Sequence, residues 1–164
     1  MRTVVIMLLG LAACVEEPDT TVVNRGRGCA YAWPSFLDER TSNAELNDPD
    51  VLPGPPYDYA MRAFAPEEPV LVWVGTSASG CATDPEGSCT VDLRGDTLVF
   101  TSRLSWNEPE EPCLTREAPP MVYALCRSPV LGAGTYKVQF GETHAAFAVP
   151  DDSSLDPCFD TDRD

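Results

Sequence analysis

The sequence has few of the residues that common catalytic sites need. It contains a single histidine, His144, and no serine in the Gly-x-Ser-x-Gly pattern of a nucleophile elbow. His144 lies in an alternating run, residues 143–150, which predicts an outward-facing side chain on a β-strand. A catalytic nucleophile needs a base held beside it, so the sequence favours a non-enzymatic protein. The many acidic residues would allow a carboxylate pair of the glycosidase kind, but no pattern selects one.

Basic residues are scarce as well. The chain has 11 Lys and Arg against 26 Asp and Glu, and its formal net charge is −15. Removal of residues 1–13, which is predicted below, takes away Arg2 and leaves −16. Phosphate backbones and anionic lipid surfaces repel so acidic a chain, which argues against nucleic acid as a partner. The hydrophobic fraction of 43% nevertheless indicates a folded domain rather than a disordered acidic chain.

Long apolar runs are absent except at the start of the chain. Arg2 precedes an uncharged apolar stretch from Val4 to Ala13. About ten residues are too few for a membrane-spanning helix, which needs about 20, but they match the apolar region of a secretory signal. Residues 1–13 are therefore predicted to be a signal peptide.

The residues that end this stretch, Leu11-Ala12-Ala13-Cys14, resemble the lipobox of bacterial lipoproteins. The resemblance implies cleavage before Cys14, lipidation of Cys14 and a membrane partner reached through the acyl chains, each buried CH₂ contributing about 0.8 kcal/mol. In that family, Asp directly after the cysteine favours the inner membrane. Val15 stands there instead, which favours the outer membrane. The alternative is an ordinary signal peptide followed by a chance cysteine.

The other six cysteines form an even set, as expected for disulfides in an exported protein. Zinc ligation is the alternative, but zinc sites favour Cys pairs two to four residues apart, and the sequence has none. It has no Cys-x-x-Cys redox motif either. Six cysteines allow fifteen pairings. The favoured scheme joins neighbours and then the two ends of the domain: Cys81 with Cys89, Cys113 with Cys126, and Cys29 with Cys158.

The rest of the chain predicts one all-β domain with short strands. We expect a tether over residues 14–28, a domain over 29–150 with an irregular part at 29–56, and an acidic tail over 151–164. A short helix at 36–46 is weakly indicated. Strands are predicted at residues 57–64, 70–74, 89–93, 97–104 and 121–126 and within 132–141 and 143–150, with turns at Gly95-Asp96 and Gly141-Glu142. This pattern is typical of an antiparallel sandwich.

One phrase near the end resembles bacterial immunoglobulin-like domains. Leu131, Gly134, Tyr136 and Val138 fit the "Leu-x-x-Gly-x-Tyr-x-Val" pattern that leads into the final hairpin of those domains. The resemblance covers roughly residues 57–150. It implies an immunoglobulin-like β-sandwich and says little of function. The cysteine pattern departs from the Cys…Trp…Cys arrangement of antibody domains.

Two sets of residues are candidates for ligand binding. Asp160, Asp162 and Asp164 alternate as acidic residues do in calcium loops, although the chain ends before the glycine and the glutamate of that pattern. An acidic solvated tail is the favoured reading, and no cofactor is expected apart from this calcium alternative. Trp33 and Trp106 stand beside loop residues and would anchor an envelope protein or a glycan if exposed. Packing in the core is the favoured reading for both.

Together these observations predict a lipid-anchored protein of the cell envelope that acts as a binding or structural accessory module. A secreted hydrolase or hydrolase inhibitor, with its site built from loops, is the first alternative. A calcium-dependent adhesion module that uses the acidic tail is the second.

Overall fold

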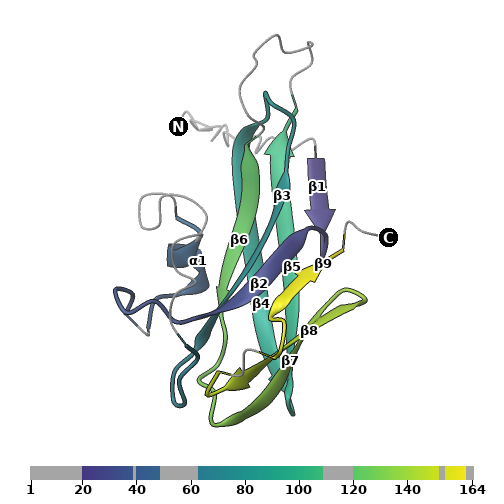
Figure 1. Ribbon diagram of the computed structural model, residues 1–164. Coiled ribbons are helices and arrows are strands. Elements are labelled where there is room, and N and C mark those ends of the chain that lie inside the picture. Colours follow the sequence, from purple (N-terminus) through teal and green to yellow (C-terminus); the bar gives the residue numbers. More distant parts are fainter. Residues whose placement is uncertain (1–19, 39, 49–62, 109–119, 152–153, 162–164) are drawn as a thin grey trace, which may run out of the picture.

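The computed structural model describes residues 20–38, 40–48, 63–108, 120–151 and 154–161. Within these residues the chain is almost entirely β (Figure 1). The elements are, in order, β1 Thr20–Val23, β2 Arg27–Ala32, α1 Asn43–Leu46, β3 Val70–Ser77, β4 Thr83–Arg94, β5 Thr97–Asn107, β6 Met121–Arg127, β7 Gly134–Phe140, β8 Thr143–Val149 and β9 Cys158–Asp160.

The strands form two sheets. The five-stranded sheet is built on β5, which pairs with β4 on one edge and with both β1 and β7 on the other, and β8 follows β7. The four-stranded sheet has the order β6-β3-β2-β9. β4 and β6 are therefore the end strands of their sheets. They lie next to each other in Figure 1, so that the two sheets approach along a β4–β6 seam.

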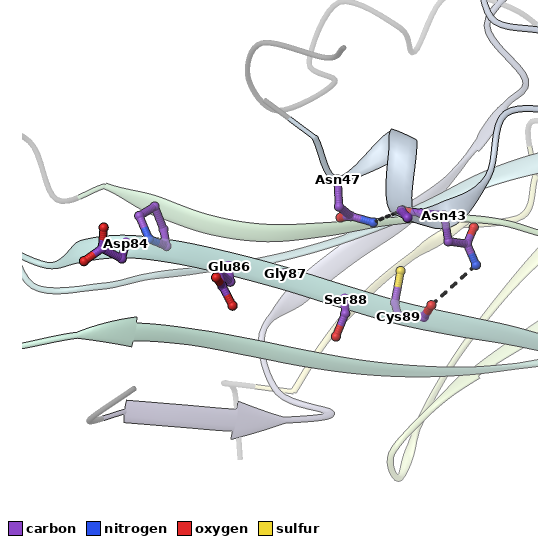
Figure 2. A pocket seen from close by; sticks show the side chains of 9 residues that line it. Asn43, Asn47, Asp84, Glu86, Gly87, Ser88 and Cys89 are labelled. Carbon is purple, nitrogen blue, oxygen red and sulfur yellow. Dashed lines mark hydrogen bonds between the residues drawn. The ribbon is translucent and has the colours of Figure 1, made fainter. Parts of the chain in front are cut away.

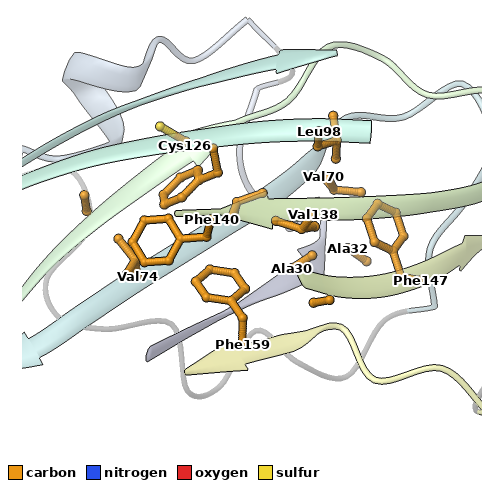
Figure 3. Packing of buried hydrophobic residues seen from close by; sticks show 14 of the residues in the cluster. Ala30, Ala32, Val70, Val74, Leu98, Cys126, Val138, Phe140, Phe147 and Phe159 are labelled. Carbon is orange, nitrogen blue, oxygen red and sulfur yellow. The ribbon is translucent and has the colours of Figure 1, made fainter. Parts of the chain in front are cut away.

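One apolar core lies between the two sheets (Figure 3). Phe100 from β5 and Phe140 from β7 contact each other in a tilted arrangement with ring centroids 5.3 Å apart, and Phe159 from β9 lies 4.9 Å from Phe140. Val72 and Val74 of β3 reach the same core from the opposite sheet and are fully buried. Side chains from both sheets thus exclude water from one shared interior, which supplies most of the driving force for folding.

A second, smaller apolar cluster covers the outer face of the four-stranded sheet. Leu71 and Trp73 of β3 and Leu125 of β6 pack there against Trp33 and Leu46. Because strand side chains alternate between faces, these residues need a cover that the main core cannot provide. The segment that contains α1 is that cover. It explains why residues 70–74 are buried on both faces, as their continuous apolar sequence predicts.

The predicted hairpins are confirmed. β4 and β5 pair around the turn Gly95-Asp96, and Gly95 adopts the left-handed φ of 65° that glycine tolerates best. β7 and β8 pair around Gly141-Glu142, where Gly141 has φ 57°. Both hairpins form from adjacent sequence, so alternation and turn residues suffice to locate them.

The expectation of a purely antiparallel fold is wrong. Residues 97–100 of β5 pair in parallel with residues 137–140 of β7. The two segments are far apart in sequence, and no local sequence pattern indicates whether two distant strands pair in parallel or antiparallel.

Some predicted boundaries also need correction. β1 and the start of β2 occupy residues 20–28 of the expected tether, and β2 continues into the expected irregular part. β9 lies in the expected acidic tail. These strands are short and contain polar residues or glycine, so their sequences carry little of the apolar alternation that predicts a strand. Of the expected strand 57–64, residues 57–62 lie outside the described residues, and Phe64 is a buried loop residue. The expected helix 36–46 is reduced to α1.

The structure confirms one favoured disulfide and corrects the other two. Cys29 and Cys158 are bonded and stand opposite each other on β2 and β9. Their Cα atoms are 4.0 Å apart, because the Ala30 N–H donates to the Pro157 carbonyl at 3.0 Å and leaves them a closely spaced non-hydrogen-bonded pair.

Cys89 bonds Cys126, so the predicted Cys81–Cys89 and Cys113–Cys126 pairs are wrong. Residues 83–89 belong to extended β4 and span roughly 20 Å at about 3.3 Å per residue, too far for Cys81 to reach Cys89. Cys81 is also disulfide-bonded, and Cys113 lies outside the described residues. The Cys89–Cys126 bond ties β4 to β6 across the seam.

The described part of the chain has no helix of the length and apolar character that a membrane span needs.

Candidate functional site

α1 is a single helical turn that begins with a capping box. The Ser42 hydroxyl accepts from the Glu45 N–H at 3.3 Å, and the Glu45 carboxylate accepts from the Ser42 N–H at 2.7 Å. These two bonds satisfy backbone donors that a helix start leaves open. The turn buries Leu46 completely in the second apolar cluster. The cap and this one apolar contact fix the position of α1 on the sheet.

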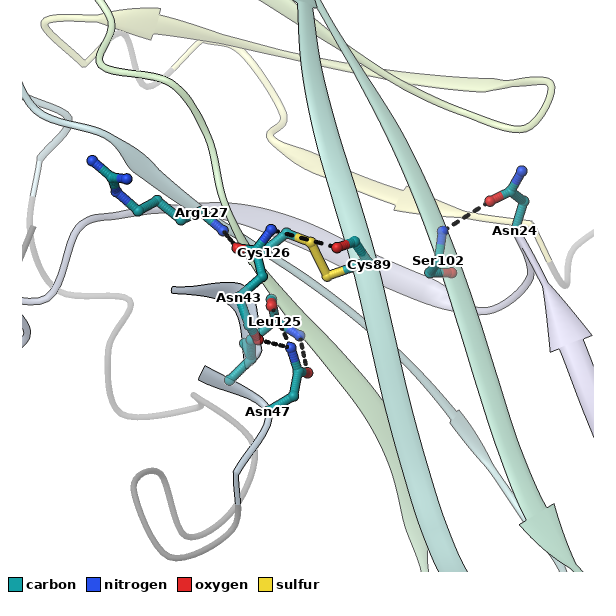
Figure 4. The surroundings of a disulfide bond; sticks show 8 residues. All are labelled: Asn24, Asn43, Asn47, Cys89, Ser102, Leu125, Cys126 and Arg127. Atoms are coloured by element: carbon teal, nitrogen blue, oxygen red, sulfur yellow. Dashed lines mark hydrogen bonds between the residues drawn. A yellow bond between two sulfur atoms is a disulfide. The ribbon is translucent and has the colours of Figure 1, made fainter. Parts of the chain in front are cut away.

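Two asparagines of the α1 turn bind the outer edge of β6 (Figure 4). The Asn47 side chain accepts from the Leu125 N–H at 2.8 Å and donates to the Leu125 carbonyl at 2.8 Å. The Asn43 side chain accepts from the Arg127 N–H at 2.8 Å and donates to the Cys89 carbonyl of β4 at 3.4 Å. We call Asn43 and Asn47 the asparagine clamp. The clamp satisfies edge groups on β6 and also reaches β4.

A groove of about 690 Å³ lies between α1 and β4 (Figure 2). Asn43, Ala44 and Asn47 form one wall, and residues 84–89 of β4 form the other. Asp84 and Glu86 are exposed and no basic residue lines the groove, so its electrostatic potential is negative. We call this hollow the α1–β4 groove. Six consecutive strand residues form one of its walls, a lining that suits an extended chain.

The β4 wall is irregular at one end and tightly packed in the middle. The register with β5 shifts between Thr83 and Glu86, a β-bulge in which Asp84 has φ 51° and Pro85 follows. Gly87 then passes so close to β6 that a Cβ there would lie 1.8 Å from the Tyr123 carbonyl oxygen. Only glycine permits this approach, which brings the two sheets together beside the Cys89–Cys126 disulfide.

A second hollow, of about 600 Å³, lies over β2, β9 and the start of β8. Arg27, His144, Asp156 and Asp160 line it, together with the Cys29–Cys158 disulfide. His144 is exposed, as its place in the alternating run predicts. Both disulfide sulfurs are engaged in the cross-strand bond, so the lining offers charged and hydrogen-bonding side chains but no free thiol.

Glu108 is the ionisable group with the clearest partners near the end of β5. The Ser79 hydroxyl and the Trp106 indole N–H both donate to its carboxylate. These hydrogen bonds, the one from Ser79 foremost, lower the pKa of Glu108 from its ordinary value of 4.5. The contact therefore stabilises the fold above the unfolded pKa, and this contribution is lost as the pH falls through the lower folded pKa.

We expect the fluorescence of Trp106 to change in an acid titration with a midpoint below 4.5, as Glu108 protonates and stops accepting from the indole. Ser79→Ala should raise that midpoint, because the largest cause of the lowered pKa is removed. Glu108→Gln is the control and should abolish the transition. A midpoint that does not move in Ser79→Ala would contradict this assignment.

The two tryptophans and the C-terminal aspartates that were candidates for ligand binding do not form a common site in the described residues. Trp33 and Trp106 are buried, with 3% and 7% of their surfaces exposed, so they do not present the exposed faces that a partner anchor needs. The Trp33 indole N–H donates to the Leu37 carbonyl at 3.2 Å. Asp160 lies on β9 opposite Arg27, and Asp162 and Asp164 lie outside the described residues. No three His, Cys, Asp or Glu side chains gather into a metal-binding group within the described ranges.

Sequence reasoning missed the asparagine clamp. The spacing Ser42-x-x-Glu45 is a capping-box signature and could have placed the start of the helix. Nothing in the local sequence could have shown that Asn43 and Asn47 meet β6, because Asn47 and Leu125 are 78 residues apart.

The fold and the groove define a disulfide-bonded β protein of two facing sheets, with one helical turn closing the seam between them. No family model, curated protein or solved structure matches the chain.

Proposed function

We propose that the protein is an exported lipoprotein of the cell envelope, held at a membrane through Cys14. Its domain acts as a non-enzymatic binding or structural accessory module, and the outer membrane is the favoured location. The lipobox-like residues 11–14 directly after an apolar stretch are the basis for the anchor.

The state of the cysteines is the observation that carries the proposal. All five cysteines in the described part of the chain are disulfide-bonded. Such bonding persists in oxidising compartments outside the cytoplasm. An exported protein with an amino-terminal signal accounts both for these bonds and for a separate cysteine at position 14.

The position of β1 bears on how the domain would sit at the membrane. Only residues 15–19 separate Cys14 from Thr20, the first residue of β1. Six residue steps reach at most roughly 20 Å. In the proposed arrangement the end of the domain where β1 begins faces the membrane closely, instead of being carried away from it on a long tether. Trp106, the register partner of Thr20, belongs to the same end.

The proposal includes an immunoglobulin-like β-sandwich as the finer fold class. Two sheets around one core support it, and so does the position of Tyr136 and Val138 on β7, directly before the final hairpin strand β8. The groove between α1 and β4 and the hollow over β2 and β9 are the candidate contact surfaces of such a module.

Replacement of the anchor residue tests the proposal. In a bacterial host, we expect Cys14→Ser to release the protein from the membrane fraction, and its intact mass should lack the acyl chains of the mature wild type. The reason is that two or three acyl chains hold a protein at a bilayer firmly, whereas an acidic surface is repelled by anionic lipid.

Cys29→Ser/Cys158→Ser is the matched control, because it also replaces cysteines but leaves Cys14 in place. This control should stay in the membrane fraction with its acyl mass. The proposal fails if Cys14→Ser keeps the membrane association and the acyl mass of the wild type.

A further inference from the structure

The native disulfides join cysteines that are distant in the chain. Cys89 and Cys126 are 37 residues apart, and Cys29 and Cys158 are 129 apart. Cys81, by contrast, precedes Cys89 by only eight residues. The entropic cost of closing a loop rises with loop length, so an unfolded chain should join Cys81 to Cys89 about tenfold more often than it joins Cys126 to Cys89. The first bond that the unfolded chain forms is therefore not a native one.

A bond between Cys81 and Cys89 is incompatible with the native β4. A disulfide holds its two Cα atoms within about 7 Å of each other. Residues 83–89 of extended β4 span roughly 20 Å, and residues 86–89 pair with β5 in that extended form. A chain with the local bond therefore cannot complete the start of β4 or bring Gly87 against Tyr123 of β6. The local bond has to open before the domain can fold.

Burial sets the order in which the native bonds can form. Cys126 is fully buried in the main core, and its bond to Cys89 joins β4 and β6 (Figure 4). An external thiol cannot reach the Cys126 sulfur once the core has closed, so this bond must be in place earlier. Cys158 is exposed and lines the hollow over β2 and β9 together with Cys29. The Cys29–Cys158 bond can therefore close last, on a folded domain that already holds both cysteines opposite each other.

We propose that this chain is a substrate of thiol–disulfide exchange: the local Cys81–Cys89 bond forms first, and an external thiol has to open it before the core closes. The partner is defined by its chemistry, a reduced and reactive thiolate of the kind that disulfide isomerases present. The oxidising compartment of the proposed function supplies the oxidant that forms the bonds. Refolding in vitro tests the exchange without the lipid anchor, so the two proposals fail separately.

The exchange conserves atoms and electrons. The external thiolate attacks the Cys89 sulfur, forms a mixed disulfide with it and releases Cys81 as a thiolate. The Cys126 thiolate then attacks the Cys89 sulfur, which forms the native bond and releases the external thiolate unchanged. This isomerisation consumes no oxidant and no reductant. It also leaves Cys81 with a free thiol for the separate disulfide that it makes in the native structure.

Oxidative refolding of the reduced, unfolded full chain tests the proposal. Cys14→Ser is present throughout, so that lipidation plays no part. One reaction contains diamide alone, which joins thiols in pairs and supplies no thiol for exchange. The other contains oxidised glutathione with an excess of reduced glutathione, which supplies the external thiolate. Non-reducing peptide mapping should show mainly Cys81–Cys89 with diamide, and a yield of Cys89–Cys126 at least about fivefold higher with glutathione.

A chain without the competing cysteines should not need exchange. Cys81→Ser/Cys113→Ser removes the nearest partners in sequence of both Cys89 and Cys126. It should form the Cys89–Cys126 bond as completely in diamide as in glutathione. If this variant does not fold, the parent chain provides the test. Alkylation soon after diamide is added, followed by peptide mapping, should show Cys81–Cys89 as the first bond.

Cys29→Ser/Cys158→Ser is the matched control, because it also lacks two cysteines but keeps the local pair. Its yield of the Cys89–Cys126 bond should still depend on glutathione. Equal yields of this bond with diamide and with glutathione in the parent chain would overturn the proposal. The appearance of Cys89–Cys126 as the first bond under diamide would overturn it as well.

Discussion

Removing the disulfide between Cys29 and Cys158 should lower the free energy of unfolding by about 4 to 5 kcal/mol. The bond joins residues 129 apart in sequence, so it restricts the unfolded chain strongly. Chain entropy alone gives about 5 kcal/mol for a loop of this length. Urea denaturation of Cys29→Ser/Cys158→Ser, with the other disulfides intact, measures the loss. A difference under about 1 kcal/mol would contradict this prediction.

In addition to this global loss, β9 should open locally more often. This strand pairs with β2 over only three residues, and Phe159 depends on that pairing for its place against Phe100 and Phe140. We expect the Phe159 amide to exchange much faster in the double variant. Cys89→Ala/Cys126→Ala is the comparison, because it removes a bond between residues 37 apart in sequence and should leave the exchange of β9 amides unchanged.

The second large effect is expected for Gly87→Ala. The added Cβ would lie 1.8 Å from the Tyr123 carbonyl oxygen and 2.7 Å from its carbon, both of which are backbone atoms. β4 cannot move away freely, because Cys89 ties it to Cys126 two residues further on. Separation of the strands or strain in the backbone should cost about 3 kcal/mol of unfolding free energy.

Gly132→Ala is the matched control for this prediction. A Cβ at Gly132 would meet nothing within 4 Å, and Gly132 is not among the glycines with positive φ. Its alanine variant should be as stable as the wild type or slightly more stable, since the unfolded chain loses freedom. Equal midpoints for both variants in thermal or urea unfolding would show that the close approach of β4 and β6 is not restrictive.

Much of the β structure could be predicted because it is local. The continuous apolar run at 70–74 indicated a strand buried on both faces, and the alternation on either side of Gly95 and Gly141 indicated two hairpins. The structure confirms all three. β1 and β9 were missed because strands of four and three residues are too short to show a clear alternation.

The candidate site was much less predictable. The α1–β4 groove depends on Asn43 and Asn47, residues that in sequence suggest only a turn or a cap. Their role comes from β6, which is distant in the chain. Core packing was the favoured reading for Trp33 and Trp106, and the structure buries both indoles. The residues that cover them are distant in the chain, so the sequence could not show which ones they are.

By itself the sequence determined the β class and the hairpins, since alternation and turn glycines act through residues near each other in the chain. The even number of cysteines beyond Cys14 indicated disulfides but not their pairing. Only the tertiary structure decided the Cys89–Cys126 bond, the parallel pairing of β5 with β7 and the asparagine clamp on β6. These features depend on which distant strands become neighbours. That choice follows from burying both faces of β3 and from closing the seam between β4 and β6, and no short stretch of sequence encodes it.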